Sequence, residues 1–274
     1  IAANKVMKSG VLSEFIAKPG NFFLGGKNVK KFEKLACKIF KVKYAISVNS
    51  WTSGLTAAIG AIGIEPGDEI ICSPWTMSAS AISILHWNAI PVFVDIDPIT
   101  FNLDLEKLKK KINKKTKAIM AVDIFGQSED IDKIKRIIKN KNIKIISDAA
   151  QSPYALYKNK FAGTLGDIGG YSLNYHKHIN TGEGGIVVTN NKNLADRTRL
   201  IRNHAESSTS KTSSKKELSN MLGYNFRLGE IEAAIGIEQL KKLKKIVIFR
   251  QKLAKILTNG LGKLSGLKVP YIRP

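Results

Sequence analysis

The chain has 274 residues, 43% of them hydrophobic, and a formal net charge of +22. This length can bury one large core, or a large domain together with part of a smaller one. No apolar run is long enough to span a bilayer, and residues 1–5 do not resemble a signal peptide, so no membrane partner is expected.

The positive charge admits two interpretations. A basic chain can bind nucleic acid or an anionic surface. Here the lysines are scattered in pairs and triplets, such as 109–111 and 241–242, without interleaved aromatic residues. We therefore favour a generally basic surface and expect no nucleic-acid partner. Cys37 and Cys72 lie in apolar segments without metal-ligand spacing, which indicates buried thiols in a reducing compartment, the cytoplasm.

Strand-like and helical segments alternate along most of the chain. Helical patterns cover residues 1–8, 28–40, 55–62, 78–86, 105–112, 130–139, 194–202 and 228–245, and continue over 246–263. Strand patterns cover residues 43–48, 69–72, 90–94, 116–122, 144–147 (running into Asp148) and 185–189. The Ser-, Thr- and Lys-rich residues 204–219 predict a mobile loop.

Nearly continuous apolar strands that alternate with helices predict an α/β fold with a mostly parallel sheet between helices. In such sheets the site lies at the carboxyl ends of the strands. The segments that follow strands are residues 50–53, 75–77, 148–151 and 172–177. We expect the chemistry to come from these four segments.

Lys177 is the central candidate for catalysis. It lies between two histidines, in a loop that ends in Gly-Glu-Gly-Gly, which is a poor place for a packing residue. A lysine there is suited to hold a carbonyl cofactor as a Schiff base. The alternative is a solvated lysine, in a chain that has many. The flanking histidines receive no role, and Asp95 and Asp97 are interpreted as turn residues before Pro98.

A strand also leads into the polar turn 49–54, which opens a helix. Free N–H groups and hydroxyls at a helix N-terminus can bind a phosphate, and Thr52 and Ser53 would contribute to it. Ordinary N-capping by serine or threonine explains the same residues equally well.

Seven stretches, in order and spacing, resemble the pyridoxal-phosphate-dependent sugar aminotransferases of the DegT/DnrJ/StrS group. They are residues 49–55 (NSWTSGL), 66–70 (PGDEI), 91–98 (PVFVDIDP), 148–152 (DAAQS), 166–169 (GDIG), Lys177 with 182–185 (GEGG), and 223–228 (GYNFRL). The resemblance implies the aspartate aminotransferase-like fold, with residues 1–245 as the large cofactor-binding domain, including an N-terminal arm at 1–26. Residues 246–274 would be a linker helix and the start of a small C-terminal domain that is mostly missing, so we expect a fragment.

The resemblance also implies roles for individual residues. Lys177 matches the lysine that holds pyridoxal 5′-phosphate covalently, and Asp148 the carboxylate that pairs with the pyridinium nitrogen. Gln151 matches the residue near the phenolic oxygen. Thr52, Ser53 and Ser172 match phosphate-binding residues, and Asn225 matches the asparagine that reaches the cofactor phosphate of the neighbouring subunit in a homodimer.

One position departs from the family pattern. Met77 stands where the family usually has an aromatic residue stacked on the pyridine ring. A thioether can also lie against an aromatic ring, so cofactor binding is expected to survive. The neighbouring Trp75 is expected to be a core or wall residue.

The function implied is transfer of an amino group from an amino acid, glutamate, to a keto group of a nucleotide-activated sugar, for surface polysaccharide such as lipopolysaccharide. Three alternatives remain. The first is a sugar dehydratase of the same family, in which the lysine position is histidine. The second is a cofactor-binding regulatory homologue. The third is an aminotransferase for a cyclic non-sugar ketone.

Overall fold

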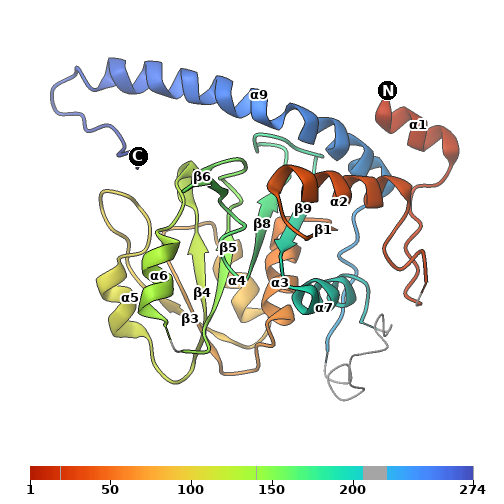
Figure 1. Cartoon of the computed structure of the whole chain (residues 1–274), viewed down its shortest axis with the longest axis horizontal. Helices are drawn as coiled ribbons and strands as arrows, with labels where there is room; N and C mark the ends of the chain where they lie inside the picture. The colour runs from red at the N-terminus through yellow and green to blue at the C-terminus, as the bar shows by residue number, and fades with distance from the viewer. Residues whose placement is uncertain (19, 140, 206–220, 274) are drawn as a thin grey trace.

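A mixed seven-stranded sheet forms the centre of the protein (Figure 1). The computed structural model describes residues 1–18, 20–139, 141–205 and 221–273. The strand order is β1-β9-β8-β5-β4-β2-β3. The bounds are β1 Tyr44–Val48, β2 Glu69–Cys72, β3 Ile90–Phe93, β4 Thr116–Val122, β5 Lys144–Asp148, β8 Ile168–Ser172 and β9 Gly185–Thr189.

The sheet is parallel except at one strand. β9 runs antiparallel to both of its neighbours, β1 and β8, and the remaining pairs are parallel. Every strand except β9 therefore points in the same direction, and their carboxyl ends share one edge. The predicted mostly parallel α/β fold is confirmed.

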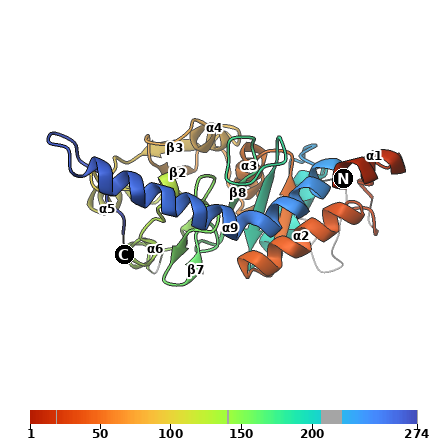
Figure 2. The same ribbon diagram turned by 90° about the horizontal axis from the view of Figure 1, so that it is seen from above.

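Helices cover both faces of the sheet. Their bounds are α1 Ala2–Ser9, α2 Lys27–Phe40, α3 Trp51–Ala61, α4 Ala79–Leu85, α5 Leu105–Lys111, α6 Ile131–Ile137, α7 Lys192–Arg202 and α9 Glu230–Leu261, with a 3-10 turn, η1, at Ile124–Gly126. Viewed from above, α3 and α4 lie on one side of the sheet and α2 and α6 on the other (Figure 2).

Alternate strand residues build the core on each face. In β4, Ala118 and Met120 belong to the cluster under α3, α4 and α7, whereas Ile119 and Ala121 belong to the cluster under α5 and α6. This is the two-residue period of a strand that is buried on both faces. A third cluster joins α2 and the first half of α9 to the sheet near β8 and β9.

The 32-residue helix α9 runs without interruption through residue 246 and lies along one side of the molecule (Figure 1). Its buried side chains end at Val247, and beyond that point Ile248, Phe249 and Leu253 are exposed. The start of a second domain near residue 246 stays a prediction. None of the helices in the described ranges combines the length and the apolar composition that crossing a membrane requires.

Most element predictions are confirmed, with a few differences. Strand β8, Ile168–Ser172, lies in a segment for which no strand bounds were predicted. The helix expected from residue 55 begins at Trp51, because Ser50 caps it. The short antiparallel pair β6 (Leu156–Tyr157) and β7 (Lys160–Phe161) was not predicted. Cys72 is buried as expected, but Cys37 is only partly buried. Most of the loop predicted to be mobile, residues 206–219 of it, lies outside the described residues.

Candidate active site

Polar side chains gather at the shared carboxyl edge of the parallel strands. Asp148 is the last residue of β5, and Ser172 is the last residue of β8. β1 is followed at once by Asn49 and by Ser50, the N-cap of α3. The site therefore lies where the parallel-sheet rule places it.

Asp148 is buried and has several hydrogen-bond donors. Its Oδ1 accepts from the indole Nε1 of Trp51 at 2.7 Å and from the backbone N–H of Ala150 at 3.2 Å. Its Oδ2 accepts from the hydroxyl of Ser80 at 2.8 Å. A buried carboxylate is costly without such partners, so these donors allow a negative charge to stand at this edge of the sheet.

Lys177 lies in the turn between β8 and β9 and is partly buried. Its backbone N–H donates to the carbonyl of Asn174 at 2.9 Å, which holds the turn. Burial lowers the pKa of the Lys177 amine, and the nearby negative charge of Asp148 acts in the opposite direction and raises it. The amine and the carboxylate, 29 residues apart in the sequence, thus act on each other across the site.

The first turn of α3 offers hydroxyl groups and backbone N–H groups. The N–H of Ser53 donates to Oγ of Ser50 at 3.0 Å, and the two serine hydroxyls lie 2.9 Å apart. Thr52 is exposed and Ser53 partly exposed. The N-capping interpretation is therefore confirmed for Ser50, and it leaves the hydroxyl of Thr52 at the open end of the helix.

The other predicted site residues differ in exposure. Oε1 of Gln151, just after β5, accepts from the N–H of Phe125 at 3.0 Å. Met77 is 68% exposed, in the loop between β2 and α4. Asn225 is exposed, and its Oδ1 accepts from Nε of Arg227 at 2.8 Å. A ligand that entered this edge could reach Met77 without rearrangement of the core.

Ser172 and Asn225 are tied to the same region by local contacts. The hydroxyl of Ser172 accepts from the N–H of Asn174 at 3.3 Å. The carbonyl of Asn225 accepts from Nδ2 of Asn49 at 3.5 Å, and Asn49 directly precedes the cap of α3. The chain segment that carries Asn225 therefore lies beside the end of β1.

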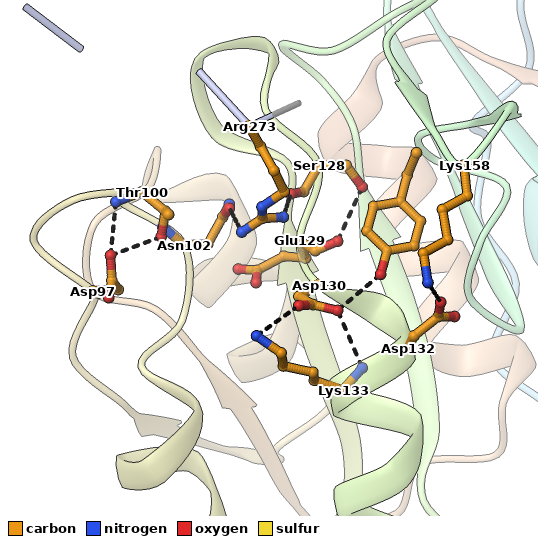
Figure 3. Close-up of polar contacts among 11 residues, drawn as sticks. Asp97, Thr100, Asn102, Ser128, Glu129, Asp130, Asp132, Lys133, Lys158 and Arg273 are labelled. Atoms are coloured by element: carbon orange, nitrogen blue, oxygen red, sulfur yellow. Dashed lines mark hydrogen bonds and ion pairs between the residues drawn. The ribbon is translucent and has the colours of Figure 1, made fainter. Parts of the chain in front are cut away.

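Two aspartates that could suggest a metal site form turn contacts instead. Oδ1 of Asp97 accepts from the N–H groups of Ile99 at 2.9 Å and Thr100 at 2.7 Å, and from the Thr100 hydroxyl at 3.0 Å (Figure 3). Asp95 pairs with Lys107 at 2.8 Å. Asp97 is therefore a turn residue, as predicted, whereas Asp95 forms an exposed ion pair with a lysine of α5. Trp75 is not a core residue: it is 50% exposed and stacks on Phe101.

Sequence reasoning missed the partners of Asp148. Trp51 stands in the polar turn that the sequence presents as a phosphate site or a helix cap, and Ser80 stands in a segment predicted only to be helical. A Cβ on Gly54 would lie 2.7 Å from the indole of Trp51, a close packing that only the structure reveals.

The chain is similar to known proteins over most of its length. It is 36% identical to the spore coat polysaccharide biosynthesis protein SpsC of Bacillus subtilis, over 90% of this chain and 65% of that protein. It is 38% identical to GDP-perosamine synthase of Caulobacter vibrioides, over 87% of this chain and 63% of that protein. The chain thus spans less than two thirds of the length of these two relatives.

Solved structures show the same architecture. A structure of the E. coli GDP-4-keto-6-deoxy-D-mannose-3-dehydratase with bound hydrated PLP superposes with a TM-score of 0.86 at 31% identity, covering 98% of this chain and 71% of that one. The model of the DegT/DnrJ/EryC1/StrS aminotransferase family matches residues 13–273. The chain therefore belongs to the DegT/DnrJ/EryC1/StrS aminotransferase family.

Proposed function

We propose that the chain is the cofactor-binding part of a pyridoxal-phosphate-dependent sugar aminotransferase. The enzyme moves an amino group from an amino acid, glutamate, to a keto group of a nucleotide-activated sugar. The observation that carries the proposal is the buried, hydrogen-bonded carboxylate of Asp148, whose negative charge acts on the partly buried amine of Lys177. A keto sugar that gains an amino group is a building block for surface polysaccharide, including lipopolysaccharide.

The residues present fit the chemical groups of pyridoxal phosphate. A buried carboxylate suits a protonated ring nitrogen, and an amine with a lowered pKa suits an aldehyde. The start of α3, with Thr52 and Ser53, suits the phosphate, together with the hydroxyl of Ser172. Gln151 would lie near the phenolic oxygen and Met77 against the ring.

Lys177 and Asp148 have different roles in the proposed reaction. The cofactor, when bound, supplies an electron sink that depends on a protonated ring nitrogen. Asp148 holds that proton in place by charge pairing. Nζ of Lys177 takes the proton from the α-carbon of the donor amino acid as a general base and returns it as a general acid. Its lowered pKa favours the neutral amine that the first of these transfers needs.

The strongly basic composition of the chain is consistent with an anionic substrate. A net charge of +22 would attract the diphosphate of a nucleotide sugar from solution. We propose further that the enzyme acts in the cytoplasm as a homodimer, in which the exposed Asn225 of each subunit reaches the cofactor phosphate of the other. The exposure of Asn225 is compatible with such a contact.

A sugar dehydratase is the second candidate, since a solved relative of this chain has that activity in its name. In the dehydratases of this family the lysine position is expected to be histidine. Lys177 therefore favours the aminotransferase. A regulatory homologue would bind the cofactor and not exchange amino groups.

The test uses the full-length protein loaded with pyridoxal phosphate. Borohydride should bleach the visible absorbance and leave the reduced cofactor on the peptide that contains Lys177, as read by mass spectrometry. Lys177→Ala should abolish this labelling, and Lys110→Ala, at an exposed position on α5, should not change it.

Adding glutamate then distinguishes an aminotransferase from a regulatory homologue. It should convert the bound cofactor to its amine form, and a nucleotide-linked keto sugar should restore the visible band. Labelling without conversion would favour the regulatory homologue. Labelling of other lysines but not Lys177 would overturn the proposal.

A further inference from the structure

The indole of Trp51 links two parts of the candidate site. Trp51 is the first residue of α3, in the same turn as Thr52 and Ser53. Its side chain is buried, and Nε1 donates to Oδ1 of Asp148 at 2.7 Å. The turn that would hold a phosphate is thereby bonded directly to the carboxylate at the end of β5.

Two glycines create the space that the indole occupies. A Cβ on Gly54 would lie 2.7 Å from Cε3 of the ring, and a Cβ on Gly170 would lie 2.4 Å from Cζ3. Gly54 is on α3 and Gly170 on β8. Side chains at these two positions would collide with the ring, so the two glycines allow the indole to pack there with Nε1 bonded to Asp148.

Ser80, near the start of α4, holds the other carboxylate oxygen. Its Oγ lies 2.8 Å from Oδ2 of Asp148 and 2.9 Å from Oγ1 of Thr76. An ionised carboxylate only accepts, so the single proton of the Ser80 hydroxyl goes to Asp148. The Thr76 hydroxyl must then donate to Ser80, which extends the chain of hydrogen bonds to the residue before Met77.

The Asp148 carboxylate can accept one more hydrogen bond than the structure gives it. A carboxylate has about four lone-pair positions. Trp51, the N–H of Ala150 and Ser80 occupy three of them. The remaining position is available to a single N–H group, such as that of a protonated ring nitrogen.

We propose that Trp51 and Ser80 are positioning residues that orient Asp148 toward the ring nitrogen of the cofactor and stabilise its negative charge. This inference rests on the proposed function. The two residues act from opposite oxygens and from two different helices, so the carboxylate cannot rotate. The bond from Trp51 also fixes the distance between the phosphate-binding turn and the acid.

The test removes each donor with a small change of side-chain volume, and each control makes the same change at another site. Trp51→Phe removes Nε1, and its control is Trp87→Phe, since Nε1 of Trp87 donates instead to the carbonyl of Thr56 at 2.8 Å. Ser80→Ala removes the second donor, and its control is Ser83→Ala, a buried serine of the same helix that bonds to the carbonyl of Ser80. All are made in the full-length protein.

Trp51→Phe and Ser80→Ala should each raise the Kd for pyridoxal phosphate about ten-fold, the usual effect of one bond to a charged group. The pH titration of the visible band of the lysine-bound cofactor should also move to higher pH. A ring nitrogen that holds its proton less firmly withdraws less charge from the lysine nitrogen. The controls should leave both properties unchanged.

The outcomes separate the two proposals. If the variants bind the cofactor and titrate like the wild type, the positioning role is wrong, and labelling of Lys177 still supports the proposed function. If the wild type takes up no cofactor at Lys177, the proposed function is wrong, and the positioning role of Trp51 and Ser80 is then wrong as well. Unfolding of the cofactor-free protein shows whether Trp51→Phe folds. If it does not fold, the comparison of Ser80→Ala with Ser83→Ala tests the positioning role.

Discussion

Two opposing influences act on the amine of Lys177. Burial lowers its pKa, and the charge of Asp148 raises it. Replacing Asp148 by asparagine removes only the second influence, so the pKa of Lys177 should fall further below its ordinary value. The amine would then become reactive at lower pH.

Competitive labelling of amines across a pH series, read by mass spectrometry in the cofactor-free protein, measures this effect. We predict that Asp148→Asn moves the labelling midpoint of Lys177 to lower pH. Exposed Lys252 serves as the internal reference. Asp132→Asn, which removes a partly exposed acid on α6, is the matched control and should leave the midpoint in place. An unchanged midpoint in Asp148→Asn would show that the charge of Asp148 does not affect the amine of Lys177.

Lys177 and Asp148 could be selected from the sequence because each follows a strand and each matches a motif. Trp51 could not, because its bond to Asp148 joins residues 97 positions apart. No local pattern encodes the direction in which a buried indole points. That direction depends on Gly170, on a strand formed much later in the chain.

At the scale of elements, strands were predicted better than their connections. The predicted bounds of β2, β4 and β9 agree with the structure, because continuous apolar runs ended by polar residues define buried strands well. The pair β6–β7 has only two residues in each strand, too few for a periodic pattern. The start of α3 was misplaced because its first turn is polar and also carries the cap.

Helix α2 depends on a residue from another helix at its N-terminus. Its N-cap, Gly26, has no side chain to bond the free N–H groups. Glu230 of α9 supplies this cap: Oε2 accepts from the N–H of Asn28 at 2.7 Å, and Oε1 accepts from the N–H of Val29 at 3.2 Å. A carboxylate there also suits the positive end of the helix dipole.

Glu230→Ala should therefore lower the free energy of unfolding by about 1–3 kcal/mol, since it leaves buried donors without an acceptor. Urea denaturation followed by circular dichroism measures this change. Glu232→Ala, at a less buried position in the same turn, should change the stability by less than about 0.5 kcal/mol. Equal losses in the two variants would mean that helix propensity, rather than the cap, is responsible.

At the scale of the whole molecule, residues from three distant parts of the chain meet around the buried acid Glu129 (Figure 3). Its Oε1 accepts from the N–H of Leu103 at 2.9 Å, and within the described part of the chain its buried Oε2 has no hydrogen-bond partner. Arg273, close by, donates to the carbonyl of Ser128 at 2.7 Å and to Oδ1 of Asn102 at 3.3 Å.

Burial raises the pKa of Glu129 from 4.5 to about 8, and nearby Asp123 adds to this increase while Arg273 opposes it. A carboxyl group whose pKa is higher in the folded state stabilises the fold while it is protonated. That contribution is complete below pH 4.5 and is lost as the pH rises through about 8. The free energy of unfolding of the wild type should therefore fall as the pH rises from about 4.5 to about 8, because the unfolded chain releases the Glu129 proton more readily than the folded chain.

Glu129→Gln keeps the shape and the acceptor for Leu103 but cannot ionise. We predict that the variant gains stability relative to the wild type as the pH rises from 5 to 8.5, by about 4 kcal/mol over this range if the pKa is 4.5 unfolded and about 8 folded. Urea unfolding at several pH values measures the difference. Asp132→Asn is the control: Asp132 is partly exposed, pairs with Lys158, and has a lowered pKa. It is ionised throughout this range, so its variant should show no such trend. A constant difference between Glu129→Gln and the wild type would mean that Glu129 is already ionised in the folded protein at pH 5, with Arg273 balancing its charge.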